Sequence, residues 1–510
     1  MSEQPFTAPT LYGALSQSAM ARPDSIALIY EGESITYAEL MRRVDSVAEY
    51  LHGLGLRGGQ TIAAFSQNRP EFVIFFYAAA KLGIVFVPLN FNLTALEVTY
   101  VLNHCEAKYL FRDDAAAASM DLDVPSVQLE TLCIPEVSSE PASLPRDVDV
   151  DADSDVVIAY TSGSTGNPKA VAISHRATLN AALSLIELWG LSDKDTTVVA
   201  APLGFLLGLS TATTVGLLAG MKVVINRRFH PAEVLDAFIE HQATIYNGVP
   251  TMFSMMLEYS EQQGKDYDLS GVRALICSGA PMPDELLNRF ARRFQKPLQN
   301  YYGMTECYPL IGKYASDAVP FPSGAVGRIA PGANISVVGP QGQSCAPGEE
   351  GELLAQAPST LTRYHKDPDL TQLAFTNGWF KTGDLGYIDE RGYVFITGRL
   401  KEIIIRGGAN ISPVEVENTL LRHPEVVAAA VLGVPDKTYG EVPVAYVVRR
   451  AGSELSEASV ITHAEKELAK FKVPAAITFC PELPLGKTGK VDKAQLRKLW
   501  DQAEGLPATA

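Results

Sequence analysis

The chain has 510 residues, of which 47% are hydrophobic and 20% charged, and its formal net charge is −16. This length exceeds what one hydrophobic core can organise, so about two to four domains are expected. The composition is that of an ordinary globular protein. The acidic balance argues against binding of nucleic acid or of an anionic membrane surface, because both require a basic face. The six cysteines form no C-x-x-C pair, which argues against a thiolate zinc site and fits a reducing, cytoplasmic compartment.

Alternating strand and helix patterns occupy about the first 300 residues. The N-terminal MSEQPFTAPT has no basic stretch before an apolar run, so no signal peptide is expected. Strands are expected at 26–30, 61–65 and 84–89, with helices at 38–55 and 71–83. This order predicts an α/β fold with parallel sheets and crossover helices. Residues 113–155 are acidic and rich in Pro and Ser, and they are expected to form a long surface connection.

The stretch TSGSTGNPK at 161–169 is the most informative one. Its glycines allow backbone N–H groups to converge, and together with hydroxyls and an ammonium they predict a pocket for phosphate oxygens. The alternative is a flexible linker, but apolar runs flank the stretch directly at 156–160 and 170–173. The loop is not a Walker A motif, because no Gly-Lys follows Gly163 and a strand comes next. A helix is expected from Ser174, as N-cap, to Gly190.

The uncharged segment at 196–221 contains Pro202 and several glycines. It predicts a buried strand, loop and helix rather than a membrane span. From about residue 320 to 397, short Gly-punctuated strands predict a small β-rich, barrel-like unit. Beyond a boundary at 398–401, strands are expected at 426–434 and 442–448 and a helix at 456–470. Ser412-Pro413 with Glu415 predicts a helix start with a capping box.

Four further segments follow the loop in order: YYGMTE at 301–306, TGD at 382–384, GRLKEIIIRGGANISPVEVE at 398–417 and PLGKTGKVDK at 484–493. Together with the loop they resemble the adenylate-forming superfamily of acyl- and aryl-CoA synthetases, luciferase and peptide-synthetase adenylation domains. The resemblance covers nearly the whole chain and is strongest to a fatty-acyl or aryl-CoA ligase. It implies a large N-terminal domain (1–397), a hinge (398–401) and a small mobile α+β C-terminal domain (402–510) that carries a catalytic lysine.

The superfamily's reaction has two steps. A carboxylate attacks the α-phosphate of ATP and gives acyl-AMP and pyrophosphate, and a thiol, usually that of CoA, then displaces AMP. The resemblance assigns to ATP binding Thr161, Ser162, Gly163, Ser164, Thr165, Gly166, Lys169, Ser278, Gly279, Ala280, Pro281, Tyr302, Gly303, Asp384 and Arg399. Within this set Tyr302 would cover the adenine and Asp384 would accept from the ribose hydroxyls. Thr305 would contact the α-phosphate, and the Glu306 carboxylate would hold Mg²⁺.

Lys490 matches the superfamily's catalytic lysine, which would bridge the carboxylate and the α-phosphate. Lys487 stands in a similar Gly-Lys context and remains the alternative, although Val491 and Lys493 follow Lys490 in register. Lys401 occupies the hinge position. The CoA-binding residues implied by the resemblance are Arg406, Gly407 and Gly408.

Two departures concern the substrate. Phe205 replaces the His or Trp of many relatives, and Leu206 replaces the Asp that pairs the amine of amino-acid substrates, so an α-amino acid is disfavoured. The candidate acyl pocket consists of Phe205, Leu206, Leu207, Val249, Met252, Met304 and Cys307. We expect a mainly apolar carboxylic acid, with a medium- or long-chain aliphatic acid, as in fatty acid metabolism, ahead of an aryl or arylpropenoic acid.

The expected ligands are therefore ATP, Mg²⁺, coenzyme A and a small carboxylic acid. Neither nucleic acid nor a membrane span is expected, and a homodimer is left open. A second hypothesis keeps adenylation but delivers the acyl group to a carrier-protein thiol. A noncatalytic nucleotide-binding regulator is the rival from another class, and the presence of Glu306, Asp384, Arg399 and Lys490 argues against it.

Overall fold

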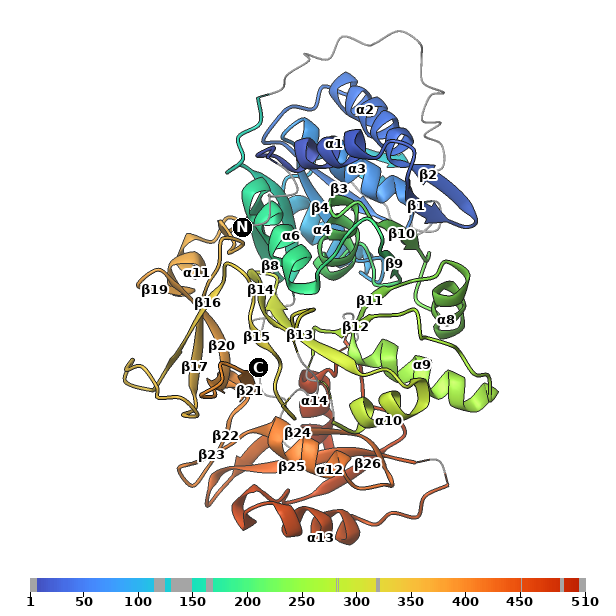
Figure 1. The fold of residues 1–510 in the computed structure, drawn as a ribbon. Helices are drawn as coiled ribbons and strands as arrows, with labels where there is room; N and C mark the ends of the chain where they lie inside the picture. Colours follow the sequence, from blue (N-terminus) through green and yellow to red (C-terminus); the bar gives the residue numbers. More distant parts are fainter. Residues whose placement is uncertain are drawn as a thin grey trace.

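The computed structural model describes residues 7–113, 124–129, 149–161, 168–280, 282, 284–317, 322–450, 452–486 and 490–503. In this part of the chain, two mainly parallel sheets alternate with layers of helices, and a smaller sheet-and-helix unit formed by the C-terminal residues lies at one end (Figure 1). The expected α/β fold, with a large N-terminal and a small C-terminal part, is confirmed.

The larger sheet of the described residues runs parallel in its centre and antiparallel at both edges. Its strand order is β15 (Arg328–Ile329), β14 (Cys307–Gly312), β13 (Leu298–Met304), β12 (Ala274–Cys277), β11 (Ile245–Gly248), β9 (Thr196–Val199), β10 (Lys222–Ile225), β1 (Ile26–Tyr30) and β2 (Glu33–Thr36). Because β11, β12 and β13 are parallel neighbours, their carboxyl ends share one edge, the usual place for ligands in such sheets.

The second sheet is parallel from β7 to β6 and ends in an antiparallel pair. Its order is β18 (Arg363–Tyr364), β8 (Lys169–Ser174), β7 (Asp155–Thr161), β4 (Val85–Leu89), β3 (Thr61–Phe65), β5 (Tyr109–Arg112) and β6 (Ser126–Gln128). The strand β6 lies in the segment that we expected to be only a surface connection, so that expectation is wrong for residues 126–128. Three residues are too few to show a period, and pairing with β5 forms the strand.

A layer of helices between the two sheets holds the main core. It contains α1 (Leu11–Ala21), α2 (Tyr37–Gly53), α3 (Pro70–Lys81), α6 (His175–Trp189) and α7 (Val215–Leu218). The strands are buried on both faces, as β3 illustrates: Ile62 and Ala64 join this central core, while Ala63 and Phe65 join the cluster under α4 (Ala95–His104). Helices α8 (Pro231–Glu240), α9 (Pro250–Gln263) and α10 (Asp284–Phe294) cover the outer face of the larger sheet.

The uncharged segment at 196–221 forms the predicted strand, loop and helix, but most of its helix is a π-helix, η1 (Leu207–Thr214), which leads into α7. The expected β-rich unit is a sheet of β16 (Asn334–Val338), β17 (Gly351–Gln356), β20 (Trp379–Ile388) and β19 (Phe375–Thr376), with β21 (Val394–Arg399) paired to β20. The short helix α11 (Pro368–Leu373) precedes β19. In the described residues, no helix is both long and apolar enough to cross a membrane.

The C-terminal unit begins after the 3₁₀ turn η2 (Leu400–Glu402). Its sheet contains β23 (Ala409–Ile411), β22 (Ile404–Arg406), β25 (Gly440–Arg449), β24 (Val426–Asp436) and β26 (Ile477–Cys480). Helices α12 (Pro413–Leu421) and α13 (Glu457–Glu467) pack on one face, and α14 (Lys493–Ala503) packs on the other. Between α13 and β26 the chain makes the 3₁₀ turn η3 (Lys470–Lys472).

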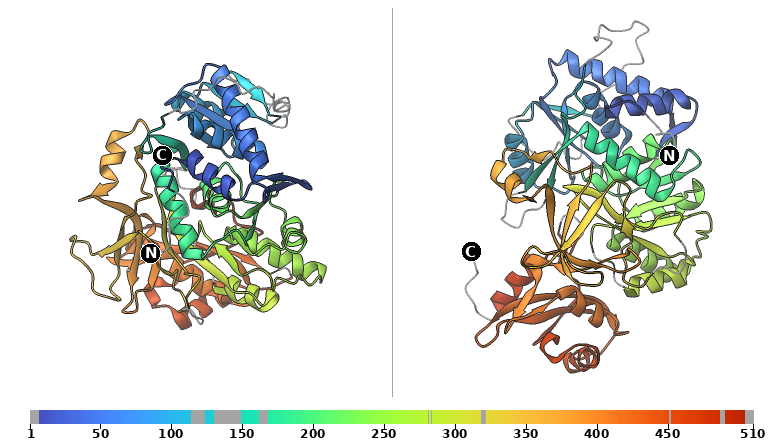
Figure 2. Two further views of the ribbon diagram at one scale, coloured as in Figure 1. Left: turned by 45° about the horizontal axis from the view of Figure 1, so that its top comes forward. Right: turned by 60° about the vertical axis from the view of Figure 1, so that its left-hand side comes forward.

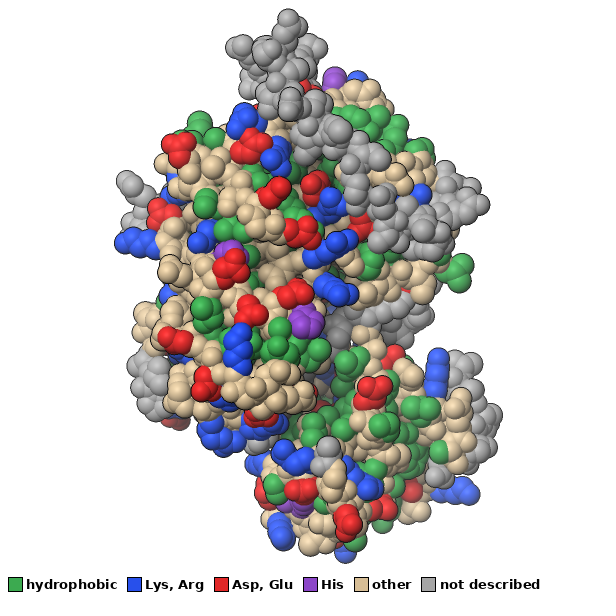
Figure 3. Space-filling view, turned by 90° about the vertical axis from the view of Figure 1, so that its right-hand side faces the viewer, with side chains coloured by type: hydrophobic (Ala, Val, Ile, Leu, Met, Phe, Trp, Pro, Cys, Tyr) green, Lys and Arg blue, Asp and Glu red, His purple; other side chains and the backbone are tan. Residues whose placement is uncertain are grey.

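The C-terminal unit stands apart from the rest of the molecule. It lies beyond β21 in the right-hand view of Figure 2, and Figure 3 shows a notch between it and the larger body. None of the apolar clusters of the described residues has members on both sides of residues 395–403.

One local prediction at the start of this unit is wrong. Helix α12 begins at Pro413 as expected, but Ser412 makes no capping hydrogen bond with its side chain. Its Oγ donates instead to the carbonyl oxygen of Thr397 at 2.5 Å, and Glu415 pairs with Lys472 at 2.7 Å. These contacts with residues distant in the sequence replace the predicted capping box.

Candidate active site

The predicted phosphate-binding loop connects the two strands of a β-hairpin. Strands β7 and β8 run antiparallel, with Thr161 opposite Lys169 as their last pair. Both residues are half-buried. The expectation that the loop runs directly into a strand is confirmed. The predicted site residues that lie outside the described part of the chain are Ser162, Gly163, Ser164, Thr165, Gly166 and Pro281, together with the alternative lysine Lys487.

Thr305 and Glu306 form the turn of another hairpin, between β13 and β14. Glu306 is 8% exposed, and its Oε1 accepts a hydrogen bond of 3.0 Å from the Tyr364 hydroxyl. The Nζ of Lys169 lies 5.4 Å from the centroid of the Tyr364 ring. The predicted metal ligand and the predicted phosphate-binding lysine therefore contact the same tyrosine. The sequence analysis did not single out Tyr364, because a two-residue strand carries no periodic signal.

The surroundings of Glu306 fit a hard divalent cation. Tyr364 occupies Oε1, and within the described residues no donor is recorded for Oε2. The same residues contain no group of three or more acidic, His or Cys side chains that could form a metal site by itself. Magnesium is commonly held by one or two carboxylates together with water and substrate phosphates. Glu306 is therefore a suitable single protein ligand for Mg²⁺.

The carboxyl ends of three neighbouring strands place the predicted nucleotide segments side by side. The register pairs Gly248 with Cys277 and Cys277 with Asn300, and the Ser278 amide donates to the Gly248 carbonyl at 3.0 Å. The segments that follow these strand positions are 249–250, 278–280 and 301–304. The structure thus brings Ser278, Gly279, Ala280, Val249, Tyr302, Gly303 and Met304 to one edge of the sheet.

Asp384 is the centre of a buried polar group beside this edge. It is 2% exposed, lies opposite Arg399 in the β20–β21 register, and its Oδ1 is 3.0 Å from Arg399 Nε. The Tyr302 hydroxyl donates to Oδ2 at 2.5 Å. Burial raises the pKa of Asp384, and Arg399 and Tyr302 oppose that rise. The carboxylate predicted to bind ribose thus already has two protein donors.

Tyr302 therefore differs from the expectation in one respect. We expected its ring to cover the adenine, and the structure also ties its hydroxyl to Asp384. Burial and the Asp384 carboxylate raise the pKa of Tyr302 well above its ordinary value, so the hydroxyl remains a donor. The ring position is fixed by this hydrogen bond, which spans 82 residues of sequence.

Lys490 reaches the same region from the C-terminal unit. It precedes Val491, which forms a bridge with Leu485, and its carbonyl accepts from the Gly486 amide at 2.7 Å. Surrounding protein and the nearby Arg399 lower the pKa of Lys490, while Asp384, Glu306 and Glu402 act in the opposite direction. Its side chain keeps an exposed face. The structure therefore brings Lys490 together with the predicted magnesium and ribose carboxylates.

The predicted hinge and CoA residues lie on the C-terminal side of β21. Lys401 is the middle residue of η2. Gly407 and Gly408 form the tip of the β22–β23 hairpin, and Gly408 has φ of +85°, a conformation that side chains with a Cβ rarely adopt. A Cβ on Gly408 would meet no atom within 4 Å in this arrangement. Arg406 donates to the Phe471 carbonyl at 2.7 Å and lies over the Tyr439 ring, so its guanidinium is already engaged.

The candidate acyl pocket is only partly assembled from the residues that we expected. Phe205, Leu207, Val249 and Met304 are half-buried, and Leu206 is buried at the start of η1. Cys307 is fully buried with its Sγ 3.2 Å from Thr360 Oγ1, and the Met252 sulfur accepts from Tyr246 at 3.5 Å. These contacts place Cys307 and Met252 in the protein core.

A close backbone contact fixes the loop that carries Phe205. A Cβ on Gly204 would lie 2.4 Å from the Leu89 carbonyl oxygen, so only glycine fits there. The Leu203 amide also donates to Asn68 Oδ1 at 2.8 Å. Phe205 is thus presented from a rigid support at the end of β4.

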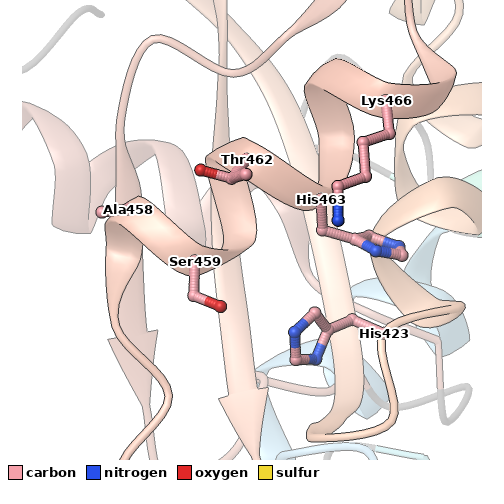
Figure 4. A pocket seen from close by; sticks show the side chains of 6 residues that line it. All are labelled: His423, Ala458, Ser459, Thr462, His463 and Lys466. Atoms are coloured by element: carbon pink, nitrogen blue, oxygen red, sulfur yellow. The ribbon is translucent and has the colours of Figure 1, made fainter.

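A cavity of about 370 Å³ lies elsewhere, on the C-terminal unit. Figure 4 shows the rings of His423 and His463 close together, with Lys466 one turn further along α13. None of the predicted site residues lines this cavity. Figure 1 shows α13 on the side of its sheet that faces away from the larger body, so the cavity is separate from the chemistry described above.

Comparison with known proteins agrees with this geometry. The family model "AMP-binding enzyme" matches residues 15–365, and "AMP-binding enzyme C-terminal domain" matches residues 415–490. A feruloyl-CoA synthase of Amycolatopsis sp. is 35% identical over 94% of this chain and 97% of its own. An indoleacetate–CoA ligase of Aromatoleum aromaticum is 32% identical over 95% and 97%, respectively.

Among solved structures, ATP-bound MatB from Rhodopseudomonas palustris has a TM-score of 0.88 and 31% identity. The match covers 98% of this chain and 100% of MatB. The similarity covers nearly the whole chain. It agrees with the structure, in which the motif residues lie at the strand ends and near Lys490, and it identifies the family. The chain belongs to the AMP-binding enzyme family, as an acid–CoA ligase of the AMP-forming class.

Proposed function

We propose that this enzyme activates a mainly apolar carboxylic acid with ATP and Mg²⁺ and transfers the acyl group to CoA. The observation that carries the proposal is that Lys490 lies close enough to Glu306, Asp384 and Arg399 for their charges to act on it. A carboxylate and a triphosphate repel each other, so the first step needs cations and N–H donors fixed in position. The C-terminal unit supplies one such cation at this place.

In the first step a carboxylate oxygen of the acid forms a bond to the α-phosphorus, and pyrophosphate leaves. Thr161 and Lys169, at the two ends of the loop, would hold the β- and γ-phosphates. Bound through Glu306, Mg²⁺ would neutralise phosphate charge. The Lys490 ammonium would stabilise the negative charge that builds on the α-phosphate oxygens.

In the second step the CoA sulfur attacks the acyl carbon and AMP leaves. One site must first surround a triphosphate and later admit a thiol. We propose that residues 402–510 act as a mobile domain that turns about Lys401, withdraws Lys490 and presents the Gly408 hairpin. Gly408 stands in open space in the present arrangement, which suits a loop that makes its close contact only after the turn.

The acid is proposed to be recognised by apolar fit, because Phe205, Leu206 and Leu207 offer no charge or side-chain hydrogen bond. Two acid classes remain. The apolar side chains of residues 205–207 favour medium- or long-chain aliphatic acids as substrates. Aryl acids gain support from the names of the two relatives, since ferulate and indoleacetate both carry an aromatic ring.

A panel of acids tests the proposal and separates the two classes. The panel contains linear acids of increasing length, benzoate, phenylacetate and cinnamate, with succinate and alanine as polar controls. For linear acids, each buried CH₂ should raise kcat/KM roughly fourfold, from about 0.8 kcal/mol, until the pocket is full. Aryl specificity would instead appear as a peak at one ring-bearing acid. A preference for succinate or alanine would refute the apolar pocket.

The thiol acceptor is tested on the same enzyme. CoA should accept the acyl group from acyl-AMP, whereas a phosphopantetheinylated carrier protein should not replace it. A transfer that proceeds only to the carrier would favour the acyl-AMP ligase hypothesis instead.

A further inference from the structure

The contacts of Tyr364 connect the two ends of the proposed phosphate and metal site. Its hydroxyl donates to Glu306 Oε1 at 3.0 Å, and its ring face lies 5.4 Å below the Lys169 ammonium. Tyr364 therefore stands between a carboxylate and a cation of opposite charge. Both charged groups are assigned to ATP binding in the proposed function, and this inference rests on that assignment.

Tyr364 is held firmly in this position. It is 4% exposed, and β18 pairs with β8, the strand that begins at Lys169, so that Tyr364 lies opposite Val171. Its amide donates to Thr371 Oγ1 at 3.0 Å. The neighbouring Arg363 forms two hydrogen bonds, of 3.1 and 2.6 Å, with Asp155. The Tyr364 ring therefore cannot move away from Glu306 and Lys169 when ligands bind to the site or leave it.

The hydroxyl is a dependable donor. It lies 3.0 Å from Glu306 Oε1, and an ordinary phenol, with a pKa of about 10, keeps its proton at neutral pH. A hydrogen bond to an ionised partner is stronger than one between neutral groups and directs one oxygen of the carboxylate. With Oε1 engaged by Tyr364, Oε2 is the oxygen left to bind a cation.

The ring has a second effect. Attraction of the Lys169 ammonium to the aromatic face holds that ammonium on the ring, on the other side from Glu306, so that the two do not form a direct ion pair. If the ring were absent, the ammonium and the carboxylate could neutralise each other, and neither would be free for phosphate or metal. The Tyr364 ring, with its hydroxyl on the side of Glu306, prevents this direct ion pair.

We infer that Tyr364 is a positioning residue that orients Glu306 for Mg²⁺ and holds Lys169 away from Glu306 for the phosphates of ATP. An outer partner of this kind typically changes metal affinity by about 10–100-fold when it is lost. The two roles belong to different atoms of one side chain, so different substitutions should separate them.

The experiment measures ATP binding to the full chain by calorimetry, without any carboxylate substrate, once in EDTA and once across a Mg²⁺ titration. Tyr364→Phe keeps the ring and should leave metal-free ATP affinity within about twofold of wild type, while Mg²⁺ affinity of the ATP complex falls about 10–100-fold. Tyr364→Leu should show the same metal defect and, in addition, a severalfold loss of metal-free ATP affinity.

Tyr314→Phe is a matched control, because the Tyr314 hydroxyl donates to the Ile329 carbonyl at 2.8 Å and Arg328 lies 5.4 Å from its ring centroid. This variant should bind Mg²⁺·ATP like wild type. The effect of Tyr364→Phe should also vanish in a Glu306→Gln background, since the hydroxyl acts through that carboxylate. A general folding defect would persist in that background and would refute the inference.

The outcomes distinguish this inference from the proposed function. A wild-type protein whose ATP binding is insensitive to Mg²⁺ would overturn both. Normal Mg²⁺-linked binding in wild type and an unchanged Tyr364→Phe would overturn the role of Tyr364 alone.

Discussion

Replacing Lys490 with alanine should separate the two half-reactions. In the structure the charges of Asp384, Glu306 and Arg399 act on the Lys490 ammonium and shift its pKa. In the first step negative charge grows on the α-phosphate, and a cation already in place stabilises that charge more than it stabilises the bound substrates. In the second step a thiol attacks the acyl carbon, and we expect no role for Lys490 there.

The structure sets the size of the effect. A fully solvated lysine would contribute about 0–1 kcal/mol, because water screens its charge. A preorganised contact in a dry site is worth about 3–4 kcal/mol, or 10²–10³ in rate. Protein around Lys490 lowers its pKa, which favours the larger figure, but its exposed face favours the lower end. We therefore expect a loss of about 100-fold in the first step.

The assay for the first step is carboxylate-dependent exchange of labelled pyrophosphate into ATP. The assay for the second step is formation of acyl-CoA from synthetic acyl-AMP. Lys490→Ala should lose exchange and retain thioester formation, and Lys487→Ala should change both only slightly. Equal losses in both assays would mean that Lys490 supports the fold, and loss of exchange in Lys487→Ala alone would mean that the motif register is wrong.

Three further results are expected. Lys490 is proposed to act as an ammonium, and its pKa is lowered. Pyrophosphate exchange should therefore fall as the pH rises through that pKa, at a lower pH than the ordinary 10.5 of lysine; a profile that stays flat up to pH 10.5 would contradict this prediction. Gly408→Leu should retain pyrophosphate release and make almost no acyl-CoA, and a loss of both would mark Gly408 as structural. Asp384→Asn should weaken ATP binding about tenfold or more, since hydrogen bonds to the charged carboxylate are lost, and an unchanged dissociation constant in calorimetry would contradict the ribose assignment.

Much of the layered fold could be predicted because the local signals agree with the final packing. The mainly apolar stretch at 61–65 is buried on both faces. Ser174 caps α6 by accepting from the Ala177 amide, and Gly190 ends that helix as expected. The failures occur where distant partners decide the structure. The short strands β6 and β18 form by pairing with the edge of a sheet. The Ser412 side chain donates to the Thr397 carbonyl instead of capping α12.

In the candidate site, too, some features could be predicted from the sequence and others could not. Motif order identified Glu306, Asp384 and Lys490, and the structure gathers them. The motifs could not reveal side-chain partners, because those join residues far apart in sequence: Tyr364 reaches Glu306 across 58 positions. Residue type alone also could not decide the role of Met252 and Cys307, since an apolar side chain beside a motif is compatible with either a pocket wall or the core, and in the structure both are buried.

The separate cores of the C-terminal unit have an energetic consequence. Ile404, Val431 and Val460 belong to one cluster, Leu432 and Leu496 to another, and none of the described residues before 404 joins either. Reorienting this unit would therefore leave both of its apolar clusters intact. Two orientations can then differ little in intrinsic free energy, and each 1.4 kcal/mol of differential ligand affinity would shift their ratio tenfold. The nucleotide or thioester state of the site, rather than the stability of the fold, would decide which orientation is populated.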